Sequence, residues 1–297
     1  MPSWQDFQPF IVTGLALGGV YALSGVGLVV LYQATGVVYL AFGAVGAMGA
    51  LITYSLISAG VAHWLAWLVC VLFCGALTLG YGMVFGPLLA RRTPLIKATT
   101  TLGLLLILFG AMDLLWTTSS GRVRSLTLPT DSGGFQIANI QINWTQVIGL
   151  AVGVVITLAT AAFLRYTKLG TAMRAMANDR DITATLGVPV RRVEAAAWLG
   201  CGLLAGIAGL LLADMVALDA TTLTFLVISS LAAALIARLR SVVVTFLAAL
   251  LVGLVQNLLV PIPSLTNYNN MAPFVLAAFA LLALSRRRVI ALSREEV

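Results

Sequence analysis

Charged side chains are scarce in this sequence. Asp, Glu, Lys and Arg make up only 9% of its 297 residues, whereas 61% of the residues are hydrophobic. A soluble domain carries about 25% charged residues, because its surface needs them to stay dispersed in water. The scarcity therefore excludes an ordinary soluble protein and predicts an integral membrane protein. No Pro- or Ser-rich linker divides the chain, so we expect a single transmembrane domain over residues 1–297.

Residues that hold metals or carry redox chemistry are also few. His63 is the only histidine, and the three cysteines (Cys70, Cys74 and Cys201) fall inside apolar runs, where cysteine behaves as a small hydrophobic residue. The sequence contains no P-loop (GxxxxGK followed by Ser or Thr), no HExxH and no GxSxG. These patterns build phosphate, zinc and acyl-transfer sites. We therefore expect this chain to bind no cofactor of its own and not to be an enzyme.

Acidic residues are missing from the middle of the apolar runs. The deepest is Asp113, near the end of one run. Carriers driven by protons or sodium ions usually keep carboxylates or histidines within the membrane, so this absence argues against a secondary transporter. The 17 Lys and Arg residues are scattered among polar segments and do not form a patch with interleaved aromatic residues, which argues against a nucleic-acid partner.

Long apolar runs make up most of what is present. A helix needs roughly 20 apolar residues to cross the hydrocarbon of a membrane. Runs of about that length recur from end to end and predict an all-α, polytopic membrane helix bundle with about 8–10 transmembrane helices. The seventh run is short, and a re-entrant helix is an alternative for it. The predicted spans are 10–32, 36–58, 64–89, 95–117, 144–165, 195–217, 223–237, 242–260 and 271–285.

Basic residues indicate which ends of these spans face the cytoplasm. Two polar segments, 118–143 and 166–194, interrupt the apolar runs, and cytoplasmic loops are enriched in Lys and Arg. An external N-terminus leaves only Arg122 and Arg124 outside and puts every other basic residue inside. The pattern therefore predicts an external N-terminus, an external 118–143 loop, a cytoplasmic 166–194 segment and a cytoplasmic C-terminus.

Glycines recur at three- and four-residue spacings within the first, second and sixth spans. Such spacings place glycines on one helix face and let two backbones approach closely. Tight packing of the bundle is the favoured interpretation, and a substrate path lined by bare backbone is the alternative. The glycines concerned are Gly14, Gly18, Gly19, Gly43, Gly46, Gly49, Gly202, Gly206 and Gly209.

The 166–194 segment is predicted to contain a short amphipathic helix. Thr171 can cap its N-terminus, Gly187 can end it, and Pro189 prevents its continuation. A helix of this kind can dock into a groove on a partner protein or lie on the membrane surface, and the residues alone favour both about equally. Its predicted apolar face consists of Leu169, Met173, Met176 or Ala177, and Leu186.

The run TKLGTAMRAMANDRDITATLGVPVRRV, at 167–193, resembles the cytoplasmic coupling segment of the branched-chain amino acid ABC permeases of the LivH type. Two other runs resemble the same family in the same order: GLALGGVYALSGVGLVVLY in the first span and RRTPLIKATTTLGLLLIL at the entry to the fourth. The resemblance therefore covers nearly the whole chain. The residues that it identifies with coupling to an ATPase are Gly170, Ala172, Arg174, Ala175, Asp179, Ala184 and Gly187.

This resemblance implies a permease subunit of an ATP-driven importer in the bacterial inner membrane, moving branched-chain amino acids or a related small solute. The implied partners are a second permease subunit, two ATP-binding subunits that carry the ATP, an extracytoplasmic solute-binding protein and membrane lipid, with no nucleic acid. From the residues alone, an ATP-independent channel or facilitator for a small solute stays open as the alternative.

One departure from the family pattern lies before the second span. The family has a segment like I-N-F-A-H-G where this chain has VYLAFG, so Tyr39 and Phe42 replace an Asn and a His. If this segment lines the substrate path, its greater bulk and lower polarity predict a solute that diverges from those of the family. The residues expected along the path are Gly18, Tyr21, Tyr39, Phe42 and Gly43.

A second departure lies between the seventh and eighth spans. The family carries a G-G-L-G-S turn where this chain has ARLRS at 237–241, so Arg238 and Arg240 replace two glycines. The turn cannot pack as closely as a glycine turn, and we expect it to bind anionic lipid or a partner instead.

Overall fold

A bundle of apolar helices makes up the fold, and the computed structural model describes residues 4–90, 92–116, 134–137, 140–216, 218–262 and 266–282. The predicted helical membrane fold is confirmed. Its elements are α1 (Trp4–Thr35), α2 (Phe42–Ser58), α3 (His63–Leu89), α4 (Pro94–Leu115), β1 (Gly134–Ile137), β2 (Ile140–Asn143), α5 (Trp144–Tyr166), α6 (Lys168–Asn178), α7 (Arg180–Thr185), α8 (Val190–Met215), α9 (Ala220–Ile236), α10 (Val242–Leu258), a 3-10 helix (Thr266–Met271) and a last helix, Ala272–Leu282.

Each predicted span coincides with one apolar helix. Five of them, α1, α3, α4, α5 and α8, are long and apolar enough to cross a membrane, and α2, α9, α10 and Ala272–Leu282 are shorter apolar helices. The second span begins at Phe42, later than expected, because Gly36 adopts a left-handed φ of 65° and ends α1. Glycine reaches that conformation without the steric cost that a Cβ would bring.

A short β-hairpin departs from the all-α expectation. Strands β1 and β2 pair in an antiparallel manner, with Gly134 opposite Asn143. Four-residue strands carry too little alternation to be recognised in a sequence. The rest of the predicted external loop, including Arg122 and Arg124, lies outside the described residues, as does the predicted cytoplasmic C-terminus.

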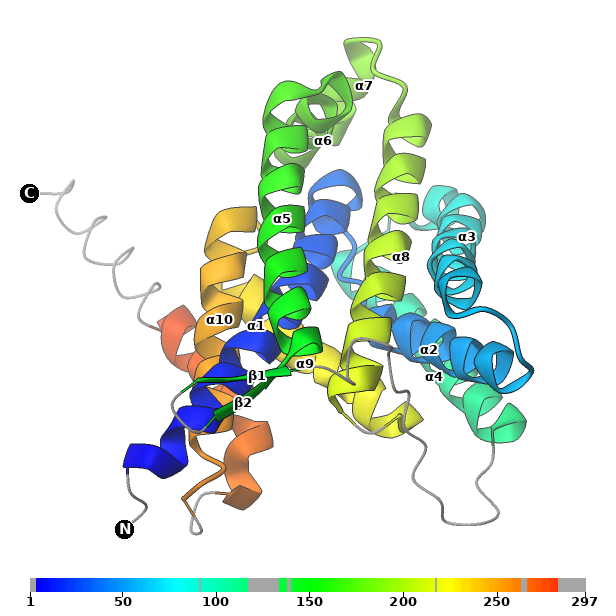
Figure 1. Cartoon of the computed structure of the whole chain (residues 1–297). Helices are drawn as coiled ribbons and strands as arrows, with labels where there is room; N and C mark the ends of the chain where they lie inside the picture. Colours follow the sequence, from blue (N-terminus) through cyan, green and yellow to red (C-terminus); the bar gives the residue numbers. More distant parts are fainter. Residues whose placement is uncertain are drawn as a thin grey trace, which may run out of the picture.

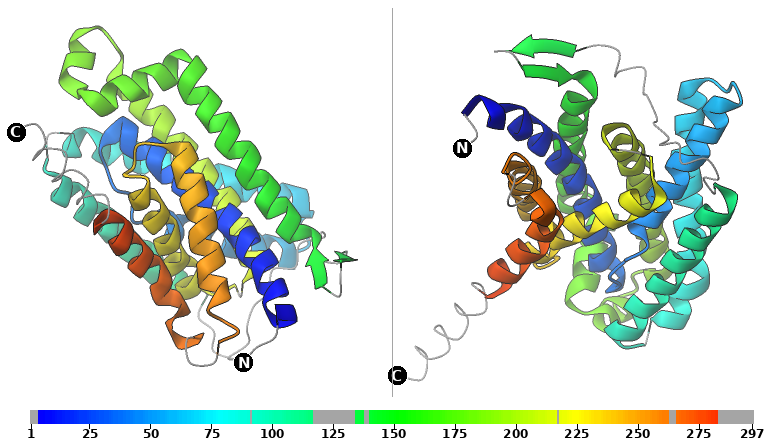
Figure 2. Two further views of the ribbon diagram at one scale, coloured as in Figure 1. Left: turned by 90° about the vertical axis from the view of Figure 1, so that its left-hand side faces the viewer. Right: turned by 90° about the horizontal axis from the view of Figure 1, so that it is seen from below.

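Helix α1 runs through the middle of the bundle, with α5 and α10 alongside it (Figure 2). In its most apolar stretch 94% of the residues are buried, whereas the corresponding fractions are 17% for α4 and 22% for α5. An apolar helix that stays exposed needs hydrocarbon around it. Helices α4 and α5 therefore face the lipid, and α1 forms the core on which the other helices pack.

Glycines set the closest approaches between helices. A Cβ on Gly18 would lie 2.9 Å from the Cα of Leu250 in α10, and a Cβ on Gly46 would lie 2.7 Å from the carbonyl oxygen of Ala205 in α8. Neither position has room for a side chain, so the backbones themselves are in contact. The packing interpretation of the glycine spacings is confirmed at these positions.

The hairpin, which is the described part of the 118–143 segment, and the 166–194 segment lie at opposite ends of the bundle. Figure 1 shows the start of α1 and the hairpin at one end, and α6 and α7 at the other. Helices α5 and α8 connect the two ends. This arrangement matches the predicted separation of the N-terminus and the 118–143 segment from the 166–194 segment.

Candidate functional site

The polar segment at the α6–α7 end begins directly where α5 stops. Thr167 is the single residue between the two helices, and its Oγ1 accepts a hydrogen bond from the backbone N–H of Gly170 at 3.0 Å. The prediction that Thr171 caps this helix is wrong. Thr171 lies inside α6, and its hydroxyl donates to the carbonyl of Thr167 at 2.9 Å. The helix starts early because Thr167 supplies the side-chain oxygen that caps it.

Helix α6 rests on the rest of the bundle through Gly170, Met173 and Met176, which are buried. A Cβ on Gly170 would collide with the backbone of Phe163 and Leu164 in α5, so only glycine allows this contact. The predicted apolar face is therefore partly wrong. Its two methionines are buried, but its other members, Leu169, Ala177 and Leu186, are exposed. The position of α5 decides which side of α6 is covered.

Asp179 divides the predicted single helix into two. Its carboxylate Oδ1 accepts hydrogen bonds from the backbone N–H groups of Asp181 and Ile182, both at 2.9 Å, and so caps α7. Side-chain acceptors of this kind compete with helix continuation and favour a new helix start. Gly187 then ends α7 with a left-handed φ of 83°, as its position in the sequence predicted.

A salt bridge ties α7 to the start of α8. The Nε and Nη2 of Arg180 donate to the same oxygen of Glu194, at 3.0 and 2.8 Å. This salt bridge and the packing of α6 against α5 attach the segment to two of the long helices.

The outer side of this segment is exposed. We call it the α6–α7 face. Two large apolar residues on this face, Ile182 and Leu186, have exposed fractions of 59% and 77%. Leu186 belongs to the predicted apolar face, whereas Ile182 was not predicted. Apolar side chains exposed together on a surface mark a contact with either another protein or the membrane. Of the seven residues predicted for coupling, Gly170 is buried, Ala172 is partly buried, and the exposed members are Arg174, Ala175, Asp179, Ala184 and Gly187.

The five residues predicted for the substrate path do not lie together. Gly18 faces the backbone of α10, and Tyr21 is buried beside Ser229 of α9. Tyr39 packs edge-on against Trp198 of α8, with ring centroids 5.2 Å apart. These contacts come from three different helices, and the sequence pattern alone could not separate them.

Phe42 and Gly43 share a small cavity between α1, α2, α8 and α9. Its accessible volume is about 10 Å³, which is about the space that one water molecule needs. Passage between these helices is therefore closed to a solute in this conformation. The cavity is lined by Ser24, Phe42, Gly43, Gly46, Ala47, Ala205, Ala208, Gly209, Leu212, Leu223 and Val227.

A second cavity, of about 390 Å³, lies between α9, α10 and the last helix. Its polar members include Ser229, whose hydroxyl donates to Oε1 of Gln256 at 3.2 Å. Gln256 was not predicted as a site residue, although an amide within an apolar span, here in the last turn of α10, is a signal that could have identified it. This cavity has room for a small solute, unlike the one beside Phe42.

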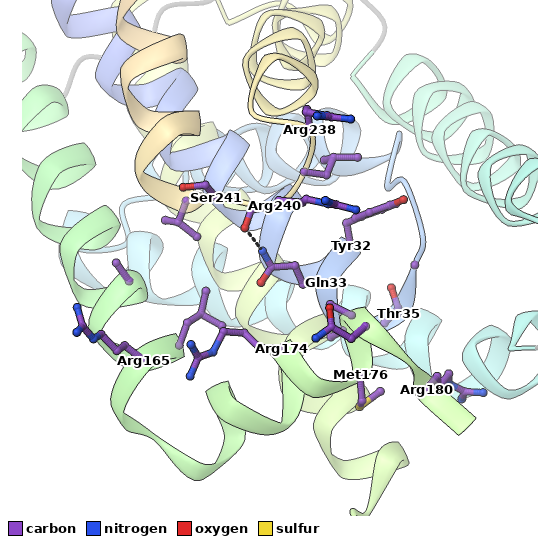
Figure 3. A pocket seen from close by; sticks show the side chains of 18 of the residues that line it. Tyr32, Gln33, Thr35, Arg165, Arg174, Met176, Arg180, Arg238, Arg240 and Ser241 are labelled. Carbon is purple, nitrogen blue, oxygen red and sulfur yellow. Dashed lines mark hydrogen bonds between the residues drawn. The ribbon is translucent and has the colours of Figure 1, made fainter. Parts of the chain in front are cut away.

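A third cavity, of about 1560 Å³, opens at the α6–α7 end and is strongly basic. We call it the basic cavity. Figure 3 shows arginines from α5, α6, α7 and the α9–α10 turn around it. Its basic lining residues are Lys97, Arg165, Arg174, Arg180, Arg238 and Arg240.

A family profile and the curated relatives with similar sequences point to the same family. The profile described as "Branched-chain amino acid transport system / permease component" matches residues 10–284. The chain is 28% identical over 224 residues to the high-affinity branched-chain amino acid transport system permease protein LivH of Salmonella typhimurium, covering 69% of this chain and 70% of that protein.

Similarity extends to an archaeal protein and to a solved structure. A probable branched-chain amino acid transport permease protein LivH of Methanocaldococcus jannaschii is 27% identical over 174 residues, which is 56% of this chain and 55% of that protein. The structure of PsaBC from Streptococcus pneumoniae in complex with Fab aligns with 93% of this chain and 89% of that one, at 16% identity and a TM-score of 0.47.

Proposed function

The chain belongs to the family of branched-chain amino acid transport permeases, and we propose on that premise that it is the membrane subunit of an ATP-driven importer. Its cargo is a branched-chain amino acid or a related small solute. The N-terminus and the hairpin lie outside the bacterial inner membrane, and the α6–α7 end lies in the cytoplasm. The positive-inside pattern of the basic residues supports this orientation.

The α6–α7 face is the observation that carries the proposal. It exposes Ile182 and Leu186 at a polar end of the molecule, while the buried side of α6 holds it against α5. A short helix fixed in this way can fill a groove on a partner and transmit its movement. Because the sequence has no P-loop, the ATP is bound by two partner subunits that dock at this face. A second permease subunit completes the membrane part, and a solute-binding protein delivers cargo at the opposite end.

Contacts of the α6–α7 segment connect it to the helices around the small cavity beside Phe42. Arg180 joins α7 to Glu194 in α8, and further along α8 the Cα of Gly209 lies against the Gly46 backbone of α2. Gly46 lines the same small cavity as Phe42. A displacement of α7 would therefore shift the helix pair that closes the cavity, which is the change that alternating access requires.

Reconstitution tests this proposal. Liposomes that contain the permease, its ATPase and the binding protein should take up solute only with ATP, and the permease alone should take up none. The variant Ile182→Ala/Leu186→Ala should lose ATPase binding and uptake together. A matched control is Leu106→Ala/Ile107→Ala, whose side chains are similarly exposed, at 67% and 69%, but lie on α4 among the lipid.

The outcomes separate the importer from its alternative. Uptake by the permease alone, insensitive to ATP, would indicate a channel or facilitator and contradict the proposal. If the Ile182→Ala/Leu186→Ala variant kept full ATP-dependent uptake, the importer would stand but the α6–α7 face would have no part in coupling, which contradicts that part of the proposal.

A further inference from the structure

The basic cavity is lined by segments that are far apart in the sequence. The C-terminal ends of α1 and α5, helix α6 and the turn between α9 and α10 all contribute to its lining (Figure 3). Because these segments belong to different helices, the arginines converge on one space only in the folded bundle. The hollow is therefore a tertiary feature and not a run of surface charge.

Positive charge in this cavity is largely uncompensated. Arg180 is paired with Glu194, and Lys97 donates to the carbonyl of Thr35 at 3.1 Å. Asp181 is the one acidic lining residue. Within the described part of the chain, four arginines of the lining form no ion pair, and their mutual repulsion disfavours the empty site. They are Arg165, Arg174, Arg238 and Arg240.

The turn that carries Arg238 and Arg240 has a strained backbone. Arg238 and Leu239 both have φ of 55°, a left-handed conformation that costs a non-glycine residue about 1–2 kcal/mol. Leu239 is buried and anchors the turn, while the carbonyl of Arg240 accepts a hydrogen bond from Nε2 of Gln33 at 2.7 Å. Strain that the surroundings maintain is characteristic of functional sites.

Gln33 also points to a ligand. Its side chain is only 8% exposed, and its Oε1 has no hydrogen-bond partner among the described residues. The bond from Nε2 to a carbonyl fixes the orientation of the amide, so Oε1 lies on the other side, toward Arg174 (Figure 3). A buried acceptor without a donor is costly. A ligand that offers a hydroxyl or N–H to Gln33, next to the negative charge that suits the arginines, would satisfy this acceptor.

We propose that the basic cavity binds a phosphate-bearing group, with an anionic phospholipid as its source. Basic pockets between membrane helices at the cytoplasmic side bind anionic head groups, and arginine matches phosphate oxygens in a bidentate manner. The glycerol hydroxyls of a phosphatidylglycerol head group supply the donor that Gln33 lacks. The cavity also borders Val243, which is followed on α10 by exposed Leu247 and Leu251, an apolar strip along which an acyl chain can lie.

Lipid titration tests the site in the full-length chain. The protein is purified in nanodiscs of phosphatidylcholine, and phosphatidylglycerol is added while the thermal unfolding midpoint and the bound lipid are measured. We expect phosphatidylglycerol to bind at least about tenfold more tightly than added phosphatidylcholine. The variant Arg238→Gln/Arg240→Gln should lose this preference. Its control is Arg191→Gln/Arg192→Gln, which removes the same charge from exposed residues outside the cavity and should keep the preference.

Soluble probes identify the source of the phosphate. If inorganic phosphate or glycerol 3-phosphate raises the midpoint of the wild type and not of the cavity variant, the site stands and its ligand is a soluble phosphate compound. Equal binding of the two lipids together with no response to soluble phosphate would overturn the proposal. It would also be overturned if the cavity variant kept its lipid preference but lost binding of the ATPase, because the arginines would then form a protein contact.

Discussion

Arg180 and Glu194 are joined by two hydrogen bonds to a single carboxylate oxygen, at 3.0 and 2.8 Å. They form a salt bridge in which both partners belong to the described part of the chain. The pair lies between α7, where we place the partner contact, and α8, which runs the length of the bundle. Loss of this salt bridge should uncouple the movement of α7 from that of α8.

We expect Glu194→Gln to loosen α7 without unfolding the bundle. Charged hydrogen bonds of this type contribute about 1.5–3 kcal/mol, so the amides of α7 should exchange with solvent at least about tenfold faster. ATP-dependent uptake should fall while the unfolding midpoint changes little. Asp181→Asn is the control, since Asp181 is exposed and makes no salt bridge in the described structure. Unchanged exchange rates in Glu194→Gln would contradict the role of the pair.

Two variants of Asp179 distinguish its role as a helix cap from the role of its charge. Because its carboxylate caps α7, we expect Asp179→Ala to cost about 1 kcal/mol in local stability and to reduce uptake. Asp179→Asn should retain both, since asparagine is an equally good cap. Uptake and α7 amide exchange measure the two effects. If Asp179→Asn is as inactive as Asp179→Ala although α7 stays protected, the charge itself contacts the partner.

Gly43 should tolerate no side chain. A Cβ there would lie 2.9 Å from Cβ of Val227 and would collide with the carbonyl of Thr224 in α9. Overpacking of this kind costs about 1–3 kcal/mol, so Gly43→Ala should lower the unfolding midpoint and impair uptake by separating α2 from α9. Gly200→Ala is the matched control, because its Cβ would meet nothing within 4 Å. Equal behaviour of the two variants would show that α2 and α9 need not stay in contact.

Cysteine labelling tests the orientation. The native cysteines Cys70, Cys74 and Cys201 are buried, so a membrane-impermeant maleimide should leave the wild type unlabelled. In intact cells the reagent should label Gly134→Cys, at the hairpin, and in inverted vesicles it should label Asn178→Cys, at the end of α6. Labelling in the reverse pattern would place the N-terminus in the cytoplasm.

Replacing Arg238 with glycine should stabilise the strained turn between α9 and α10. The left-handed backbone at Arg238 costs about 1–2 kcal/mol, and glycine would remove this cost. The greater freedom of glycine in the unfolded chain offsets about 0.4–1 kcal/mol of that gain. Arg238→Gly should therefore raise the free energy of unfolding by about 1 kcal/mol or less. Arg240→Gly serves as the control, because Arg240 does not have a positive φ and the change should not stabilise. Denaturant titration in lipid measures both.

The sequence predicted those features of the structure that depend only on residues close together in the chain. The spans follow from apolar length alone, and the end of α7 at Gly187 follows from the preference of glycine for the left-handed region. The hydroxyl of Thr100 bonds back to the carbonyl of Ile96 at 2.7 Å, as expected of threonine in a membrane helix. Each of these depends on neighbours in the chain, so the sequence contains the necessary information.

The sites were harder to predict because they depend on how helices meet. The predicted cap, Thr171, lies four residues after the cap that the structure shows, Thr167. Ile182 was not predicted as an exposed apolar residue, because the break at Asp179 that begins α7 was not foreseen. Tyr39 and Phe42, close in sequence, lie in different surroundings. One contacts Trp198 of α8, and the other lines the closed cavity.

The sequence by itself determined that this protein is a membrane helix bundle and where its helices lie along the chain, because hydropathy acts residue by residue. Its basic residues also predict that the two polar segments face opposite sides of the membrane. Tertiary structure alone decided the basic cavity. Gln33 and Arg240, whose hydrogen bond supports that cavity, are separated by 207 positions. No local pattern relates them, and only the packing of α1 against the α9–α10 turn brings them together.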